Sequence, residues 1–193
     1  MKQKKLTLPT TEQIEVEIER VNYKRKYRTV LKSTIYLLIT VAAVAILVAT
    51  LWLPVLKIYG SSMAPTMHNG DIVFSLKTTN CKQGDVVAFY YNNKLLVKRI
   101  IAEPADWVDF DDDGTVYVNG EKLEEPYLAE KAFGDTNIEL PYQVPDGKFF
   151  VMGDHRATSV DSRNTAVGCV AQEQMVGKIV FRIWPFDAFG AMN

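Results

Sequence analysis

The chain has 193 residues, a formal net charge of −1 and 48% apolar residues. This length allows one ordinary domain and an appendage, and the near-neutral charge gives no reason to expect nucleic acid or another polyanion as a partner. The apolar residues are enough for a packed core, but their uneven distribution separates an N-terminal anchor from a folded domain.

Residues 1–29 are polar and predict a cytoplasmic tail. A capping-box pattern at residues 10–13 predicts the start of a helix. Apolar residues then recur at helical spacing, namely Ile14, Ile18 and Val21. We expect a short amphipathic helix that runs into the next segment, and a solvated helix is a simpler interpretation than a partner-binding one.

An uncharged apolar run extends from Ile35 to Leu53, with Tyr36 and Trp52 near its ends. At about 1.5 Å per residue it covers roughly 28 Å, close to the ~30 Å hydrocarbon core of a bilayer. It is longer than the apolar region of a cleaved signal peptide, and bulky Leu-Trp-Leu-Pro follows it. We therefore predict a retained transmembrane helix over residues 30–53.

Basic residues flank only one end of this run. Residues 24–32 read KRKYRTVLK, with no acidic residue, whereas the only charged residues from the run to Val73 are Lys57 and Asp71. The positive-inside bias predicts a single-pass protein of the cell membrane, with a cytoplasmic N-terminus and residues 54–193 outside the cytoplasm.

Residues 54–193 contain short β-prone runs separated by turn signals: DIVFS, DVVAFYY, KLLVKRIIA, WVDF, TVYVNG, KFFVMG and KIVFRIWPF. This pattern predicts a mainly β, barrel-like domain. An Asn-Gly turn predicts a hairpin within DDDGTVYVNGEKL. Residues 104–148 are more polar and contain four prolines, which suggests an inserted excursion. Cys81 and Cys169 fit either a disulfide or two buried thiols.

The segment YGSSMAPTMHNGDIV, residues 59–73, places two adjacent serines soon after the predicted span. A serine hydroxyl needs a base to become a good nucleophile. A Ser–His–Asp triad could use His68 or His155, since such triads occur in any sequence order. Its carboxylate would then come from Asp154 or Asp161. Neither histidine has supporting sequence context.

A lysine is the other available base. At a free pKa of about 10.4, only about one lysine in 2,500 is neutral at pH 7, but burial can lower the pKa by about 3–5 units. The run LLVKRIIA predicts a strand on which Leu96, Lys98 and Ile100 share one face. Most lysines in strands are solvated, so this run alone fits a buried or an exposed Lys98.

A polar, glycine-bounded loop, GDHRATSVDSRNTAVG, covers residues 153–168. It fits a solvated turn held together by Asp–Arg pairs. It also fits a support for a catalytic lysine, in which a hydroxyl fixes the lysine and carboxylate–guanidinium pairs lock the loop.

Together these segments resemble the type I signal peptidases of the Gram-positive type, membrane-bound Ser/Lys peptidases that remove signal sequences from exported proteins. Four stretches are similar to the family's boxes, in the family's order: SMAPT (62–66), GDIV (70–73), VKRI (97–100) and GDHRATSVDSR (153–163). The resemblance covers nearly the whole chain.

The resemblance implies that Ser62 is the nucleophile and Lys98 the general base. It further implies that Ser159 orients the lysine and that Asp161 and Arg163 support it. The implied activity is cleavage after small-x-small sequences through an acyl-enzyme, without a cofactor or a metal ion. Preprotein signal peptides, the lipid bilayer and the export translocon are the implied partners.

Two positions depart from the family pattern. Gly60 stands where some members carry a hydroxyl that helps bind the oxyanion, and His155 stands where asparagine is usual. Apolar residues near the nucleophile and the base are expected to line shallow substrate pockets: Tyr59, Met63, Met67 and Val97.

Two other functions compete with this reading. A self-cleaving Ser/Lys regulator akin to the SOS repressors would need a DNA-binding domain and no membrane span. A non-enzymatic, membrane-tethered β-domain scaffold would not need the Ser62/Lys98 pair.

Overall fold

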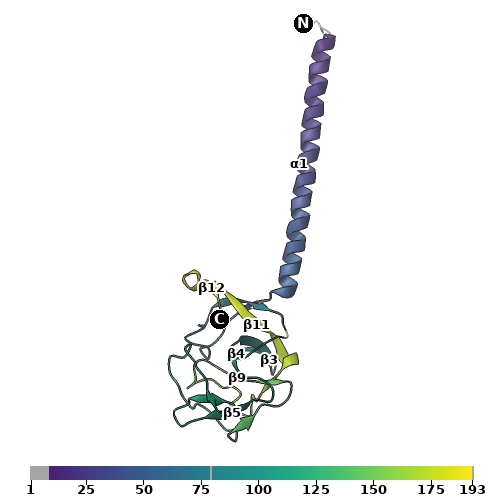
Figure 1. The fold of residues 1–193 in the computed structure, drawn as a ribbon. Helices are drawn as coiled ribbons and strands as arrows, with labels where there is room; N and C mark the ends of the chain where they lie inside the picture. Colours follow the sequence, from purple (N-terminus) through teal and green to yellow (C-terminus); the bar gives the residue numbers. More distant parts are fainter. Residues whose placement is uncertain (1–8, 79, 193) are drawn as a thin grey trace. The chain divides into compact units, whose positions relative to one another are not determined.

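The computed structural model describes residues 9–78 and 80–192. It forms two compact units, Met1–Ala49 and Thr50–Asn193 (Figure 1). The first eight residues of the predicted cytoplasmic tail and the side chain of Trp52 lie outside the described part.

One long helix, α1 (Thr11–Trp52), forms most of the first unit. The side chain of Gln13 accepts a hydrogen bond from the backbone N–H of Thr10 at 3.1 Å, which is half of the predicted capping box. All described side chains of α1 are exposed, including the apolar ones. Among the described helices, α1 alone has the length and apolar character needed to cross a membrane. The expected tail helix and the expected span are therefore one continuous helix.

The second unit is built on an antiparallel sheet of eight strands. Its strands lie in the order β1 (Val55–Lys57), β2 (Ile72–Leu76), β11 (Met175–Trp184), β3 (Val86–Tyr91), β4 (Lys94–Ala102), β9 (Lys148–Met152) and β10 (Val170–Ala171), and β12 (Gly190–Ala191) pairs with β11. The expectation of a mainly β domain is confirmed.

A smaller sheet of four strands lies within residues 104–148, the predicted excursion. Its order is β7 (Glu121–Lys122), β6 (Val116–Val118), β5 (Trp107–Phe110) and β8 (Tyr142–Gln143). Asn119 and Gly120 form the turn between β6 and β7 with φ of 54° and 81°, as the Asn-Gly pair predicts. Two 3₁₀ helices, η1 (Gln172–Gln174) and η2 (Phe186–Ala188), flank β11.

Three clusters of buried apolar side chains form the core of this unit. The first joins the β1–β2 segment to β3 and β11, and the second packs between β3, β4 and β9. The third joins β4 and β9 to the small sheet, so the inserted region has no separate core. Cys81 belongs to the second cluster and Cys169 packs against the third, and both thiols are free.

The strand β4 shows the predicted alternation. Leu96 and Ile100 pack in the second cluster, whereas Val97 and Ile101 pack in the other two. Lys98 therefore points to the face that carries the second cluster, between two aliphatic side chains.

Candidate active site

Ser62 lies in the turn-rich connection between β1 and β2. Its neighbour Met63 and the later Met67 are buried in the core, and the N–H of Met67 donates to the carbonyl oxygen of Met63 at 2.8 Å. Ser62 itself is half-buried, whereas Ser61 is exposed. A turn pinned by two core methionines therefore presents Ser62 in a fixed position.

The polar groups of Ser62 differ in their partners. Its carbonyl oxygen accepts a hydrogen bond from the N–H of His155 at 3.0 Å. Its own N–H and its Oγ make no hydrogen bond to any residue in the described part of the chain. Both groups are thus available to a substrate.

Lys98 lies in the inner half of β4 and is only 3% exposed. Burial lowers the pKa of its ammonium from the ordinary 10.5 to about 8, against the opposing effect of the Asp161 carboxylate and with a smaller contribution from Arg163. A substantial fraction of the lysine is thus neutral near physiological pH.

The strand register places Lys98 beside Gly153. Arg99 of β4 pairs with Met152 of β9 in the antiparallel ladder. Continuing this register by one step places Lys98 opposite Gly153, the residue directly after the end of β9. Opposite residues in such a ladder project to the same face of the sheet, so the Lys98 side chain lies on the face toward which a Gly153 side chain would point.

That face of Gly153 is closely covered. A Cβ atom at this position would lie 2.3 Å from the Oγ of Ser159 and 2.4 Å from the carbonyl oxygen of Ser62. Only glycine fits this approach. The structure therefore brings Ser62 and Ser159 together at Gly153, on the face to which the strand register directs Lys98.

The residues expected to support the lysine are buried: Ser159, Asp161 and Arg163. Arg163 binds Asp161 through Nε and Nη2, both at 2.9 Å, and the N–H of Gly153 donates to Asp161 Oδ2 at 3.0 Å. Burial alone would raise the pKa of Asp161, but the Arg163 hydrogen bonds and charge outweigh it and hold the pKa below its usual range. The Ser159 hydroxyl lies close enough to Asp161 to favour the carboxylate, yet it makes no well-aligned hydrogen bond to a described residue.

A second buried ion pair, which sequence reasoning did not find, joins the three segments. Arg99 donates to Asp154 through Nε at 3.0 Å and through Nη2 at 2.8 Å. The hydroxyl of Thr66, four residues after Ser62, donates to the same carboxylate. The only signal in the sequence was an arginine within an apolar strand. Asp154 therefore ties the serine segment to the strand that carries the lysine.

The histidines do not form the alternative triad. The His68 and His155 side chains are exposed, and the ring of His155 bonds the Thr158 hydroxyl. The carboxylates of Asp154 and Asp161 are occupied by arginines. Among the described residues, no histidine contacts either carboxylate through its ring.

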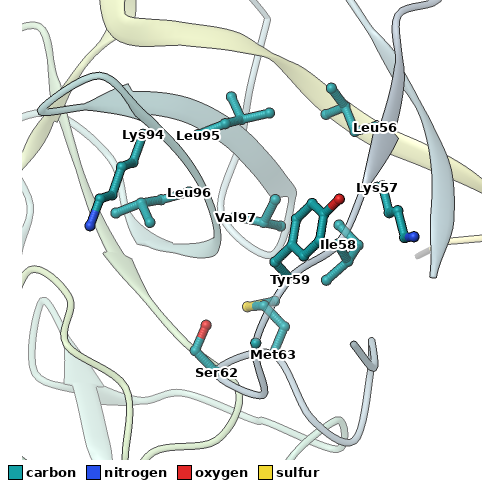
Figure 2. A pocket seen from close by; sticks show the side chains of 11 residues that line it. Leu56, Lys57, Ile58, Tyr59, Ser62, Met63, Lys94, Leu95, Leu96 and Val97 are labelled. Atoms are coloured by element: carbon teal, nitrogen blue, oxygen red, sulfur yellow. The ribbon is translucent and has the colours of Figure 1, made fainter. Parts of the chain in front are cut away.

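A groove of about 490 Å³ opens beside Ser62 (Figure 2). Tyr59, Met63 and Val97, three of the residues expected to contact substrate, line it. Met67 does not, because it is fully buried in the first core cluster. The remaining lining residues are Leu56, Lys57, Ile58, Gly60, Lys94, Leu95 and Leu96. The groove thus lies between the segment leading to Ser62 and the outer half of β4.

Comparison with known proteins identifies the family of the chain. A family described as signal peptidase, peptidase S26, matches residues 31–184. The chain belongs to this family. As a signal peptidase it is a serine endopeptidase that removes signal peptides from preproteins, and the apolar helix α1 is consistent with association of the enzyme with a membrane. Membership of a peptidase family argues against the non-enzymatic scaffold.

Individual relatives support the assignment. The signal peptidase I T of Bacillus subtilis strain 168 is 41% identical over 141 residues, which are 66% of this chain and 72% of that protein. The signal peptidase I of Bacillus amyloliquefaciens is 38% identical over 176 residues, 84% of this chain and 90% of that protein. A crystal structure of a signal peptidase I from Enterococcus faecalis V583, 34% identical, covers 51% of this chain and 96% of its own with a TM-score of 0.44. Family membership rests on the sequence matches.

Proposed function

We propose that this signal peptidase cleaves preproteins after small-x-small sequences through an acyl-enzyme on Ser62, with Lys98 as the general base. One observation carries the proposal. A lysine that is 3% exposed, with a pKa lowered to about 8, lies in register with the glycine that touches both Ser62 and Ser159.

The lowered pKa of Lys98 is large enough to matter for the reaction. At pH 7, a lysine with a pKa of about 8 is neutral in about one molecule in ten, whereas at the ordinary 10.5 the fraction is about one in 3,000. The burial that lowers the pKa thus increases the supply of base by about two orders of magnitude.

The acylation step follows from these positions. Neutral Lys98 Nζ takes the proton of Ser62 Oγ as Oγ attacks the scissile carbonyl carbon. The resulting ammonium gives this proton to the leaving amine when the peptide bond breaks, which leaves an ester on Ser62. Lys98, neutral again, takes a proton from water, the hydroxide attacks the ester, and the proton returns to Ser62 Oγ as the product leaves.

The N–H of Ser62 is the candidate donor to the developing oxyanion, since it has no partner among the described residues. Gly60 is exposed and offers no side chain to help it, and its own N–H donates to the side chain of Asn69 at 3.1 Å. We therefore assign the Ser62 N–H as the oxyanion donor within the described part of the chain, and such donors are worth about 10²–10³ in rate.

The groove suggests how an extended peptide binds. β9 pairs with β4 only at Arg99, Ile100 and Ala102, so no described strand covers that edge at residues 94–97. An extended substrate can add to this edge as a further strand, with its side chains directed alternately into the apolar groove. Tyr59, Met63 and Val97 would form shallow walls that favour small residues before the cut.

The charge pattern supports an orientation with the N-terminus in the cytoplasm and residues 54–193 outside it, since five basic residues lie directly before the apolar part of α1 and Lys57 alone follows it before Val73. In this orientation Ser62 lies a few residues beyond the membrane and meets chains as they leave the export translocon. Protease added to intact cells should then remove the β-rich unit and spare the tail. Protection of the β-rich unit would contradict the orientation.

Cleavage of a preprotein with an Ala-x-Ala site tests the chemistry. Ser62→Ala should abolish cleavage, whereas the matched control Ser61→Ala, one residue away and exposed, should cleave at close to the wild-type rate. The wild-type kcat/KM should rise with pH up to about 8 and then level off, because only neutral Lys98 can accept the serine proton. Full activity in folded Ser62→Ala would sink the proposal.

A further inference from the structure

One segment of the inserted region packs directly on the catalytic loop, although the chemistry above makes no use of it. We call residues 123–138, which form most of the strand-free connection from β7 to β8, the strap. The carbonyl oxygens of Ala132 and Phe133 accept from Arg163 Nη1 at 3.2 and 2.9 Å, and the N–H of Asn137 donates to the Arg163 carbonyl at 3.0 Å. The strap is thus fixed to the loop that supports Lys98.

An aromatic ring of the strap covers Arg99. The ring centre of Tyr127 lies 3.8 Å from the guanidinium carbon of Arg99, which is 2% exposed. Burial and the neighbouring Glu125 carboxylate raise the pKa of the Tyr127 phenol, so the ring stays neutral. A cation–π contact is strong when it is desolvated. The ring therefore holds the guanidinium in the plane in which it binds Asp154.

A buried carboxylate of the strap holds a second arginine. The side chain of Glu125 is 2% exposed and forms an ion pair with Arg156, which is fully buried. Glu125 also accepts a hydrogen bond from the Tyr127 hydroxyl at 2.9 Å. Arg156 Nε in turn donates to the carbonyl oxygen of Gly153 at 3.2 Å. One carboxylate thus connects the ring on Arg99 to the arginine on Gly153.

The peptide unit between Gly153 and Asp154 is therefore held on both sides, by Arg156 at the Gly153 carbonyl and by Arg99 at the Asp154 side chain. This peptide lies at the proposed site of the reacting groups. We propose that Glu125 and Tyr127 are positioning residues for the peptidase reaction. Through two arginines, they hold the 153–154 peptide in place against the Ser62–Lys98 pair. This inference rests on the proposed function, because it takes that pair as the reacting groups.

The arrangement predicts a specific kinetic signature. A displacement of about 1 Å between reacting groups can cost about 100-fold in rate. Neither strap residue lines the substrate groove, so kcat should fall while KM is maintained. A loosened loop would also let water reach Lys98, on which the charged groups Asp161, Arg163 and Asp154 act. Because burial is what lowers the pKa of Lys98, hydration should raise that pKa. The pH at which activity levels off should then rise above that of the wild type.

The full-length enzyme in detergent, assayed with the preprotein over a range of pH, tests the proposal. Tyr127→Leu removes the ring from Arg99 and should lower kcat by about 10- to 100-fold, with an upward shift of the activity limb. Tyr127→Phe keeps the ring and loses only the bond to Glu125, so its loss should be smaller. Tyr117→Leu is the matched control, a tyrosine of the small sheet whose hydroxyl bonds Asp111 at 3.0 Å, and it should behave as wild type.

A second measurement does not depend on activity. Glu125→Gln keeps the shape of the side chain and removes its charge. We expect faster amide hydrogen exchange at Gly153, whose N–H is bonded to Asp161, in Glu125→Gln and in Tyr127→Leu but not in the control. Faster exchange together with a shifted limb would support a positioning role.

Two results would overturn it. The first is a folded Tyr127→Leu variant in which both kcat and the pH at which activity levels off are unchanged. The second is a loss of rate that matches the loss of folded protein, while the pH at which activity levels off stays that of the wild type. Such a result would indicate a merely structural role. If activity still rises with pH and levels off near pH 8 in Lys98→Met, the proposed function is refuted. The inference then fails with it, whatever the strap variants do.

Discussion

The two halves of β4 carry the same ionisable residue in opposite surroundings. In the outer half, Lys94 and Leu95 are exposed, and the strand edge beside them is open along the groove. In the inner half, Lys98 is 3% exposed, because β9 and the loop that follows it cover this part of the strand. The proposed function accordingly assigns substrate binding to the outer half and proton transfer to the inner half. The difference arises from what packs on the strand, since the residue type is the same.

The sharpest test of this contrast exchanges the two lysines for methionine. Lys98→Met should lower the rate of preprotein cleavage by about 10²–10⁴, because the general base is lost. Lys94→Met should change it by less than about threefold, since an exposed ammonium at the rim of the groove holds no buried partner. Initial cleavage rates at saturating substrate measure both. Equal losses in the two variants would remove the distinction between the halves.

The same exchange should stabilise the protein while it inactivates it. In the unfolded chain Lys98 keeps its proton up to about pH 10.5, whereas in the folded protein it releases it at about pH 8. Between these values the unfolded state binds more protons, so the free energy of unfolding of the wild type rises with pH. The difference between the two pKa values of Lys98 corresponds to about 3 kcal/mol in the free energy of unfolding.

Lys98→Met should therefore be more stable than the wild type at pH 7 by about 3 kcal/mol, and this advantage should shrink as the pH approaches 10.5. Denaturant unfolding of the β-rich unit at several pH values measures it. Lys94→Met should show no such pH dependence. A constant difference across the whole range would mean that Lys98 is not desolvated.

A smaller change tests the close approach of Ser62 and Ser159 to Gly153, beside the inner half of β4. Gly153→Ala introduces a Cβ at 2.3 Å from Ser159 Oγ and 2.4 Å from the Ser62 carbonyl oxygen, so these atoms must move. We expect a loss in kcat of about 100-fold. The control is Gly190→Ala, whose Cβ meets no atom within 4 Å. A fully active Gly153→Ala enzyme would show that this approach is not needed for catalysis.

The smallest effect is expected in the outer half. Leu95→Ala removes part of the groove wall far from the reacting groups and should raise KM by about three- to tenfold, with kcat unchanged. Steady-state kinetics with a signal-peptide substrate resolve the two parameters. A fall in kcat without a change in KM would reverse the roles assigned to the two halves.

The longer strands could be predicted because their patterns are local. The alternation in KLLVKRIIA and the Asn-Gly turn after TVYV each encode their structure within a few residues, and both expectations are confirmed. Strands of two or three residues, such as β8, β10 and β12, carry no such pattern and exist only through the strands with which they pair.

The contacts around the candidate site were harder to predict, since they join residues far apart in the chain. Asp161 pairs with Arg163 within the loop, as an Asp–Arg lock predicts. Asp154 instead pairs with Arg99 on β4, 55 positions away, and Arg156 pairs with Glu125 of the strap, 31 positions away. No local sequence pattern predicts partners at such distances. Met67 was expected at the groove, but the turn that begins at Met63 places it in the first core cluster, where it is fully buried.

The order in which the chain is made gives the sheet a further consequence. Ser62 and Lys98 appear early, but Lys98 has no cover until residues 153–163 are present. β2 can pair with β1 at once, but it lacks its second partner until β11, near the end of the chain, has folded. Strand pairs this distant in sequence form late. In the proposed mechanism, Lys98 stays hydrated and protonated until then, so Ser62 has no base. The proposal therefore implies that the peptidase is inactive during its own synthesis and can cleave other chains only when its own chain is nearly complete.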